Sequence, residues 1–199
     1  LHLTLVPYIS AAGEVKTKPT QHSVKELRSI GIQPDILVCR CDREISKSDI
    51  RKISVFCNVD EDSVIQAIDV DTIYAVPKDL KVNGLDVAVL NALGKNTFPK
   101  SNLRKWNKVV DRIRKPTGEV TIGVVGKYLD LNDAYKSLFE ALTHGGVSNN
   151  VKVKIKNIDT DKLEKNKNKA LFNGVNGILV PGGFGKRGSE GKIFASKYA

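Results

Sequence analysis

The chain has 199 residues, of which 41% are hydrophobic and 27% are charged. This composition is typical of a globular protein and excludes a disordered chain. The 32 Lys and Arg residues exceed the 22 Asp and Glu residues, so the net charge is +10 and favours anionic partners. No apolar run reaches the roughly 18 residues of a membrane helix. Three cysteines are an odd number for a disulfide framework, so we expect a cytoplasmic protein.

The first residues predict a strand that is cut at its start. Residues 1–6 are mainly apolar and have no charged lead-in, and the chain contains no methionine. A signal peptide would show a basic stretch and a small-residue cleavage site, and neither is present. We therefore expect the chain to be an internal piece of a longer protein.

Residues 1–97 predict a first α/β unit. The strand at residues 1–6 is followed by a helix that Pro19 begins and Gly31 ends, and then by a second apolar strand. A β–helix–β crossover of this kind implies parallel strands that are buried on both faces. Further along we expect a helix capped by Asp49, a strand at 64–68, a helix perturbed by Pro77, and a helix at 85–93 that ends at Gly94.

Two further segments follow. Residues 98–118 are rich in Lys and Arg with apolar residues at helical spacing, which predicts a basic interdomain linker helix. Residues 119–199 predict a second α/β unit with a strand at 120–126. They continue with a helix that Asp133 caps and Gly145-Gly146 end, a half-exposed strand from Val151, a lysine-rich loop, and a buried strand at 177–180.

A polar loop, Lys16-Thr17-Lys18-Pro19-Thr20-Gln21, follows the first strand. Open α/β sheets bind ligands at the carboxyl ends of their strands, and a helix N-terminus favours anions. Two interpretations of this loop remain open. It either binds phosphate, or it is a solvated loop in which the proline only starts the helix. The next predicted strand ends with Arg40, Asp42 and Arg43, and Lys52 follows on a helix. These charges indicate either a second cationic cluster that binds phosphate or ordinary surface ion pairs.

The run Pro181-Gly182-Gly183-Phe184-Gly185 is the most specific motif. Closely spaced glycines after a buried strand let backbone N–H groups approach a ligand, as an oxyanion hole requires. The cysteines and histidines have no metal-ligand spacing. The basic linker helix is better explained by a solvated face than by nucleic-acid binding.

Together these motifs resemble the CTP synthase family over essentially the whole chain. The resemblance is carried by the Lys16 to Gln21 loop with its flanks, by Val120-Thr121-Ile122-Gly123, and by the glycine-rich run. It implies a synthetase domain of the P-loop, dethiobiotin-synthetase-like type and a flavodoxin-like class I glutamine amidotransferase domain, both incomplete. It also implies a glutamine-dependent ligase that aminates UTP to CTP with ATP, and a homotetramer when the protein is complete.

The resemblance assigns roles residue by residue. UTP or inhibitory CTP is assigned to Lys16, Thr17, Lys18, Pro19, Thr20, Gln21 and Lys52, and ATP to Arg40, Ile68, Asp69 and Val70. Glutamine and the oxyanion are assigned to Gly183, and the GTP effector loop to Phe184, Arg187, Gly188 and Glu190.

The resemblance also implies that parts of the machinery lie outside the chain. The family's phosphate loop and Mg²⁺ ligands are expected upstream of Leu1, and its Cys-His-Glu triad beyond Ala199. We therefore expect no catalytic or metal residue here and no activity from the chain alone. The alternative is a stand-alone basic α/β module that binds nucleic acid or a phosphorylated effector.

Overall fold

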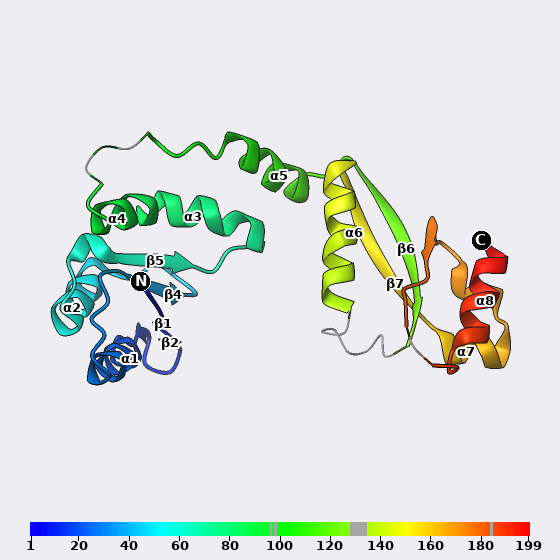
Figure 1. Cartoon of the computed structure of the whole chain (residues 1–199), viewed down its shortest axis with the longest axis horizontal. Helices are drawn as coiled ribbons and strands as arrows, with labels where there is room; N and C mark the ends of the chain where they lie inside the picture. The colour runs from blue at the N-terminus through cyan, green and yellow to red at the C-terminus, as the bar shows by residue number, and fades with distance from the viewer. Residues whose placement is uncertain (96, 98, 128–134, 184) are drawn as a thin grey trace. The chain divides into compact units, whose positions relative to one another are not determined.

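The structure is a computed structural model that describes residues 1–95, 97, 99–127, 135–183 and 185–199. The chain divides into two compact units, Leu1–Asn107 and Lys108–Ala199. Each unit contains a three-stranded parallel sheet with helices on both faces (Figure 1), which confirms the α/β class. Within the described residues no helix is both long enough and apolar enough to span a membrane. The assignment of 98–118 to a separate linker stays a prediction.

In the first unit the strand order is β1 (His2–Leu5), β4 (Leu37–Cys41), β5 (Val64–Ile68). A small antiparallel hairpin, β2 (Tyr8–Ile9) with β3 (Glu14–Val15), connects β1 to the first helix. The helices are α1 (Lys18–Ser29), α2 (Lys47–Cys57), α3 (Val76–Val82) and α4 (Leu85–Ala92), with 3-10 turns at Glu61–Ser63 and Ile73–Ala75. Helix α5 (Arg104–Arg114) begins in this unit.

Helices α1 and α2 cover one face of this sheet, and α3 and α4 cover the other (Figure 1). The expectation that every strand is buried on both faces is wrong for β1. Its Leu3 and Leu5 side chains are 64% and 56% exposed. The reason is geometric: α3 packs on β5, while β1 lies at the opposite edge of the sheet.

Two predicted helix starts differ in detail. Helix α2 is capped by Ser46, whose hydroxyl accepts a hydrogen bond from the Asp49 N–H at 3.1 Å, so Asp49 lies in the first turn instead of capping it. Pro77 lies in the first turn of α3, where its missing N–H costs no hydrogen bond, and it therefore starts the helix instead of perturbing it.

In the second unit the strand order is β7 (Val151–Asp159), β6 (Gly118–Gly126), β8 (Gly177–Leu179). Helix α6 (Lys136–Ser148) lies on one face, and α7 (Thr160–Asn166) and α8 (Ser189–Tyr198) lie on the other (Figure 1). A 3-10 turn spans Lys169–Phe172. Exposure alternates along the first residues of β7, which confirms the half-exposed strand. The predicted cap Asp133 lies outside the described residues.

Two other expectations for this unit are wrong. The predicted lysine-rich loop after β7 begins with helix α7, because Asp159 caps that helix. Helix α6 does not end at its glycines and runs on to Ser148. A Cβ atom at Gly146 would lie 2.7 Å from the Val151 carbonyl oxygen and 2.7 Å from Val153 Cγ2. Glycine is present there because α6 approaches β7 closely.

Candidate functional site

The predicted site residues of the first unit lie at the carboxyl ends of its three strands. The loop of residues 16–21 follows β1 and its hairpin, Arg40 lies near the end of β4, and Ile68 ends β5 with Asp69 and Val70 directly after it. The exception is Lys52, which lies on α2. Because the three strands are parallel, these ends share one edge of the sheet. This is the edge at which open α/β sheets bind ligands.

The loop of residues 16–21 is fixed to the sheet by its hydroxyl side chains. Thr20 is fully buried, and its Oγ1 donates to the Leu5 carbonyl oxygen at 3.0 Å. Thr17 is 3% exposed, and its hydroxyl accepts a hydrogen bond from Gln21 Nε2 at 3.1 Å. With Pro19 in the first helical turn, these contacts place Lys18 at the exposed N-terminus of α1. Thr20 therefore acts as an anchor, and direct ligand contact by it stays a prediction.

Lys16 pairs with Glu14, and the charge of Lys52 acts on the same carboxylate. The Lys16 ammonium donates to Glu14 on β3, and this hydrogen bond is the main reason that the pKa of Glu14 lies below its ordinary value. The charge of Lys52, on α2, lowers the same pKa further. The structure thus brings together two predicted anion-binding lysines that are distant in sequence. Glu14 was not predicted, and an incoming phosphate would compete with it for both lysines.

The ends of β4 and β5 form the predicted ATP-binding edge. Arg40 Nε donates to Asp69 Oδ1 at 2.8 Å, and this bond raises the pKa of Arg40. The Asp69 N–H donates to the Cys41 carbonyl oxygen at 2.9 Å, which holds residues 68–70 beside β4. Arg43 pairs with Asp42 and stacks over the Tyr8 ring, 3.2 Å from its centroid. Arg40 and the 68–70 segment are therefore adjacent, as their shared assignment requires.

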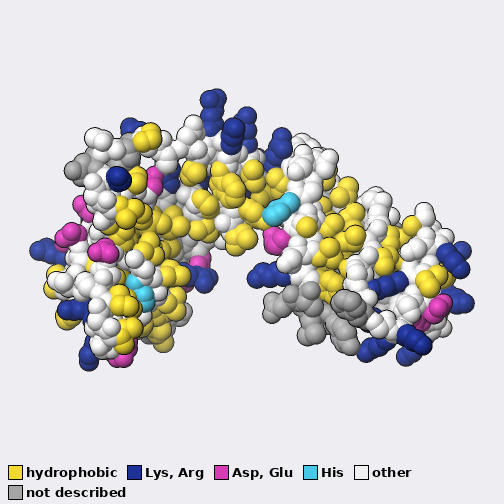
Figure 2. Space-filling model, in the orientation of Figure 1, with side chains coloured by type: hydrophobic (Ala, Val, Ile, Leu, Met, Phe, Trp, Pro, Cys, Tyr) yellow, Lys and Arg dark blue, Asp and Glu magenta, His cyan; other side chains and the backbone are white. Residues whose placement is uncertain are grey.

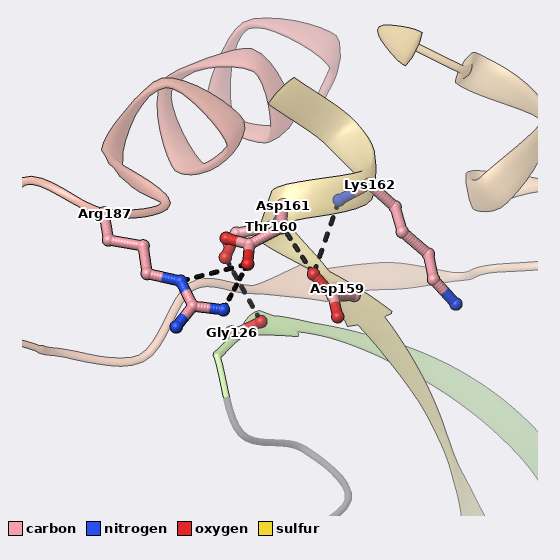
Figure 3. Close-up of polar contacts among 6 residues, drawn as sticks. All are labelled: Gly126, Asp159, Thr160, Asp161, Lys162 and Arg187. Atoms are coloured by element: carbon pink, nitrogen blue, oxygen red, sulfur yellow. Dashed lines mark hydrogen bonds and ion pairs between the residues drawn. The ribbon is translucent and has the colours of Figure 1, made fainter. Parts of the chain in front are cut away.

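The second unit has its own cluster at the ends of β6 and β7 (Figure 3). Arg187 donates to Asp161 Oδ2 through Nη2 and, at 3.0 Å, through Nε. This contact is the main cause of a lowered pKa of Asp161. Asp159 caps α7 by accepting from the Asp161 N–H at 2.7 Å. Arg187, a residue of the predicted effector loop, is thereby linked to the first turn of α7.

Thr160 explains two of the glycines in this cluster. It is fully buried, and its hydroxyl donates to the Gly126 carbonyl oxygen at 3.4 Å (Figure 3). A Cβ atom at Gly188 would lie 2.4 Å from Thr160 Oγ1, and one at Gly191 would lie 2.4 Å from the Thr160 carbonyl oxygen. Gly188 also has φ +80°, which disfavours other residues. The requirement for glycine is therefore steric at both positions.

The remaining predicted residues of this loop lie apart from that contact. Gly183 is exposed. Lys192 Nζ donates to the Pro181 carbonyl oxygen at 2.8 Å, and a Cβ atom placed at Gly183 would lie 3.2 Å from this Nζ. The Glu190 side chain is exposed, and its N–H donates to Glu164 Oε1 at 3.1 Å. Phe184 lies outside the described residues.

Sequence reasoning missed several residues that shape these sites: Glu14, Asp159, Thr160, Asp161 and Glu164. The sequence contained a signal for Asp159, because an Asp at the end of a strand and before Thr is a typical helix N-cap. The other contacts join segments far apart in sequence.

A large cavity lies elsewhere. It has a volume of about 1590 Å³ and is lined by residues before β4 and β5, including Asp35 and Ser63, together with residues of α2 and α4. This is the amino edge of the sheet, opposite to the edge that carries the predicted ligand-binding residues. In the described part of the chain no three His, Cys, Asp or Glu residues gather into a group that could hold a metal ion.

Two units, each with a parallel sheet and with charged residues at the carboxyl edge of that sheet, define an α/β protein. The family model described as CTP synthase N-terminus matches residues 1–95, and that described as glutamine amidotransferase class-I matches residues 130–199. The whole chain is 60% identical to a CTP synthase of Brucella abortus, and 58% identical to those of Methylorubrum extorquens and Bradyrhizobium diazoefficiens. The chain belongs to the CTP synthase family and spans 37% of the length of these relatives.

Proposed function

We propose that this chain is the part of a CTP synthase that joins the nucleotide-binding synthetase domain to the glutamine amidotransferase domain. The complete protein would aminate UTP to CTP in the cytoplasm, with ATP and Mg²⁺, as a homotetramer. Glutamine or ammonia would supply the nitrogen. The observation that carries the proposal is the match to CTP synthases through both units, at 58–60% identity over all 199 residues.

The geometry supports a triphosphate site at the edge of the first sheet. Lys16 pairs with Glu14, and Lys52 acts on the same carboxylate through its charge. Lys18 lies at the N-terminus of α1, where the helix dipole also favours an anion. We assign the triphosphate of UTP, or of CTP acting as an inhibitor, to this cluster. The adjacent Arg40 and residues 68–70 are assigned to ATP.

In the second unit we assign glutamine and its oxyanion to Gly183, and GTP, as an activator, to Phe184, Arg187, Gly188 and Glu190. The Arg187 side chain is 62% exposed and can be reached by an anion from solvent. The alternative is a stand-alone basic α/β module that binds nucleic acid or a phosphorylated effector. Matches to CTP synthase and amidotransferase models that run through both units do not support it.

The test is a chimera in which this chain replaces the matching 37% of the Brucella abortus relative. CTP formation from UTP, ATP and glutamine is measured by chromatography, with the parental enzyme as reference. In the active chimera, Lys18→Ala is expected to raise the UTP concentration for half-maximal rate about tenfold, the effect of one lost charge-assisted contact. Inhibition by CTP should weaken in parallel.

Lys25→Ala is the matched control, because Lys25 is exposed on the same helix and has no assigned role. An inactive chimera would refute the proposed function. An active chimera in which the Lys18 and Lys25 variants behave alike would refute only the assignment of the triphosphate site. Arg187→Ala should remove most stimulation by GTP, with Lys186→Ala as its charge-matched neighbour.

A further inference from the structure

A second cavity in the first unit lies away from the strand ends and has a strongly cationic lining. Its volume is about 630 Å³, and it is formed by residues of α3 and by the segment that leads into α5. Four cations line it, namely Lys78, Lys81, Lys100 and Arg104, and no lining residue is acidic. Within the described residues, none of the four forms an ion pair. Figure 2 shows Lys and Arg side chains gathered over the α5 segment.

The walls of this cavity are tied together by specific contacts. Lys81 Nζ donates to the Ser101 carbonyl oxygen, and the Ser101 hydroxyl donates to Asp86 at the start of α4. Trp106 Nε1 donates to the Tyr74 carbonyl oxygen at 2.7 Å, which fixes the beginning of α5 next to the turn that precedes α3. These contacts hold α3, α4 and the segment that leads into α5 together around the cavity.

Two further features indicate the kind of ligand. The first turn of α5 lies at the cavity, because Ser101, Asn102 and Arg104 line it, and a helix N-terminus adds positive potential. Asn107 also lines the cavity, and its buried Oδ1 has no hydrogen-bond partner in the described structure. A buried acceptor without a donor is costly, so a ligand that supplies a hydroxyl or amine hydrogen would be favoured.

We propose that the cavity between α3 and the start of α5 binds a small phosphorylated molecule that also carries a hydroxyl group, such as a sugar phosphate. Its volume lies in the range of small-molecule sites, about 300–1,000 Å³. A nucleic acid would instead need an extended basic track. This site is distinct from the proposed triphosphate site and does not depend on it.

The test uses the 199-residue chain and two probes, ribose 5-phosphate and sulfate, with binding followed through backbone amide shifts in NMR spectra. Ribose 5-phosphate is expected to shift the amides of residues 101–104. The double variant Lys78→Gln, Lys100→Gln should weaken its affinity about tenfold or more. The control Lys105→Gln, Lys108→Gln removes the same charge from α5 outside the lining and should change the affinity less than about twofold.

Equal weakening by the two double variants would show diffuse electrostatic attraction and overturn the proposal. Shifts confined to residues 16–21 would overturn it as well, because the probe would then occupy only the triphosphate site. Asn107→Leu tests the ligand class: it should weaken ribose 5-phosphate binding and leave sulfate, which has no hydrogen to donate, unaffected. Unchanged ribose 5-phosphate affinity in this variant would overturn the proposed hydroxyl contact.

Discussion

Adjacent glycines in α6 allow a direct test of how this helix packs on the second sheet. Gly145 is exposed, with no atom within 4 Å of a Cβ placed there. A Cβ at Gly146 would lie 2.7 Å from the backbone carbonyl oxygen of Val151, which cannot move without displacing β7. Replacing glycine by alanine inside a helix stabilises it by about 1 kcal/mol. That gain is common to both positions, so the difference between the two variants isolates the packing effect.

We expect Gly145→Ala to raise the free energy of unfolding by about 0.5–1 kcal/mol. Gly146→Ala should fall below Gly145→Ala by about 1–3 kcal/mol, the usual cost of overpacking. In a unit of this size that difference corresponds to at least about 4 °C in melting temperature. Urea and thermal unfolding followed by circular dichroism measure both quantities. Equal stabilisation by the two substitutions would refute the close approach of α6 to β7.

Other consequences concern hydroxyl and ion-pair contacts. Thr20→Val removes the buried hydroxyl that donates to the Leu5 carbonyl oxygen, and urea unfolding should show a loss of about 0.5–1.5 kcal/mol; an unchanged midpoint would contradict the anchor. Arg187 lowers the pKa of Asp161, so this pair stabilises the fold above the ordinary Asp pKa of about 3.9 and stops doing so as the pH falls through the lowered value. The stability difference between wild type and Asp161→Asn should therefore shrink on acidification, and a difference independent of pH would contradict the ion pair.

Much of the fold could be predicted from local sequence patterns. The apolar stretches that became β4, β5 and β6 predicted strands, because a parallel sheet covered by helices buries apolar side chains on both faces. Gly31 and Gly94, both with positive φ, follow α1 and α4 where helix-ending glycines were expected. The polar loop after β1 and the glycine-rich run after β8 were recognisable as candidate sites, because residue type and strand position are both local information.

The contacts within those sites were decided by the tertiary structure. Pairing of Arg187 with Asp161, and of Arg40 with Asp69, joins segments more than twenty residues apart, and periodicity carries no information about such distances. The role of Gly146 likewise depends on how closely α6 approaches β7, so a glycine that resembled a helix end is a packing position. By itself, the sequence determined the order and type of the main elements and their family resemblance, since hydrophobic period, caps and motifs act locally. Only the tertiary structure determined which charges meet and which faces stay exposed, because these depend on the packing of strands and helices that the chain brings together from a distance.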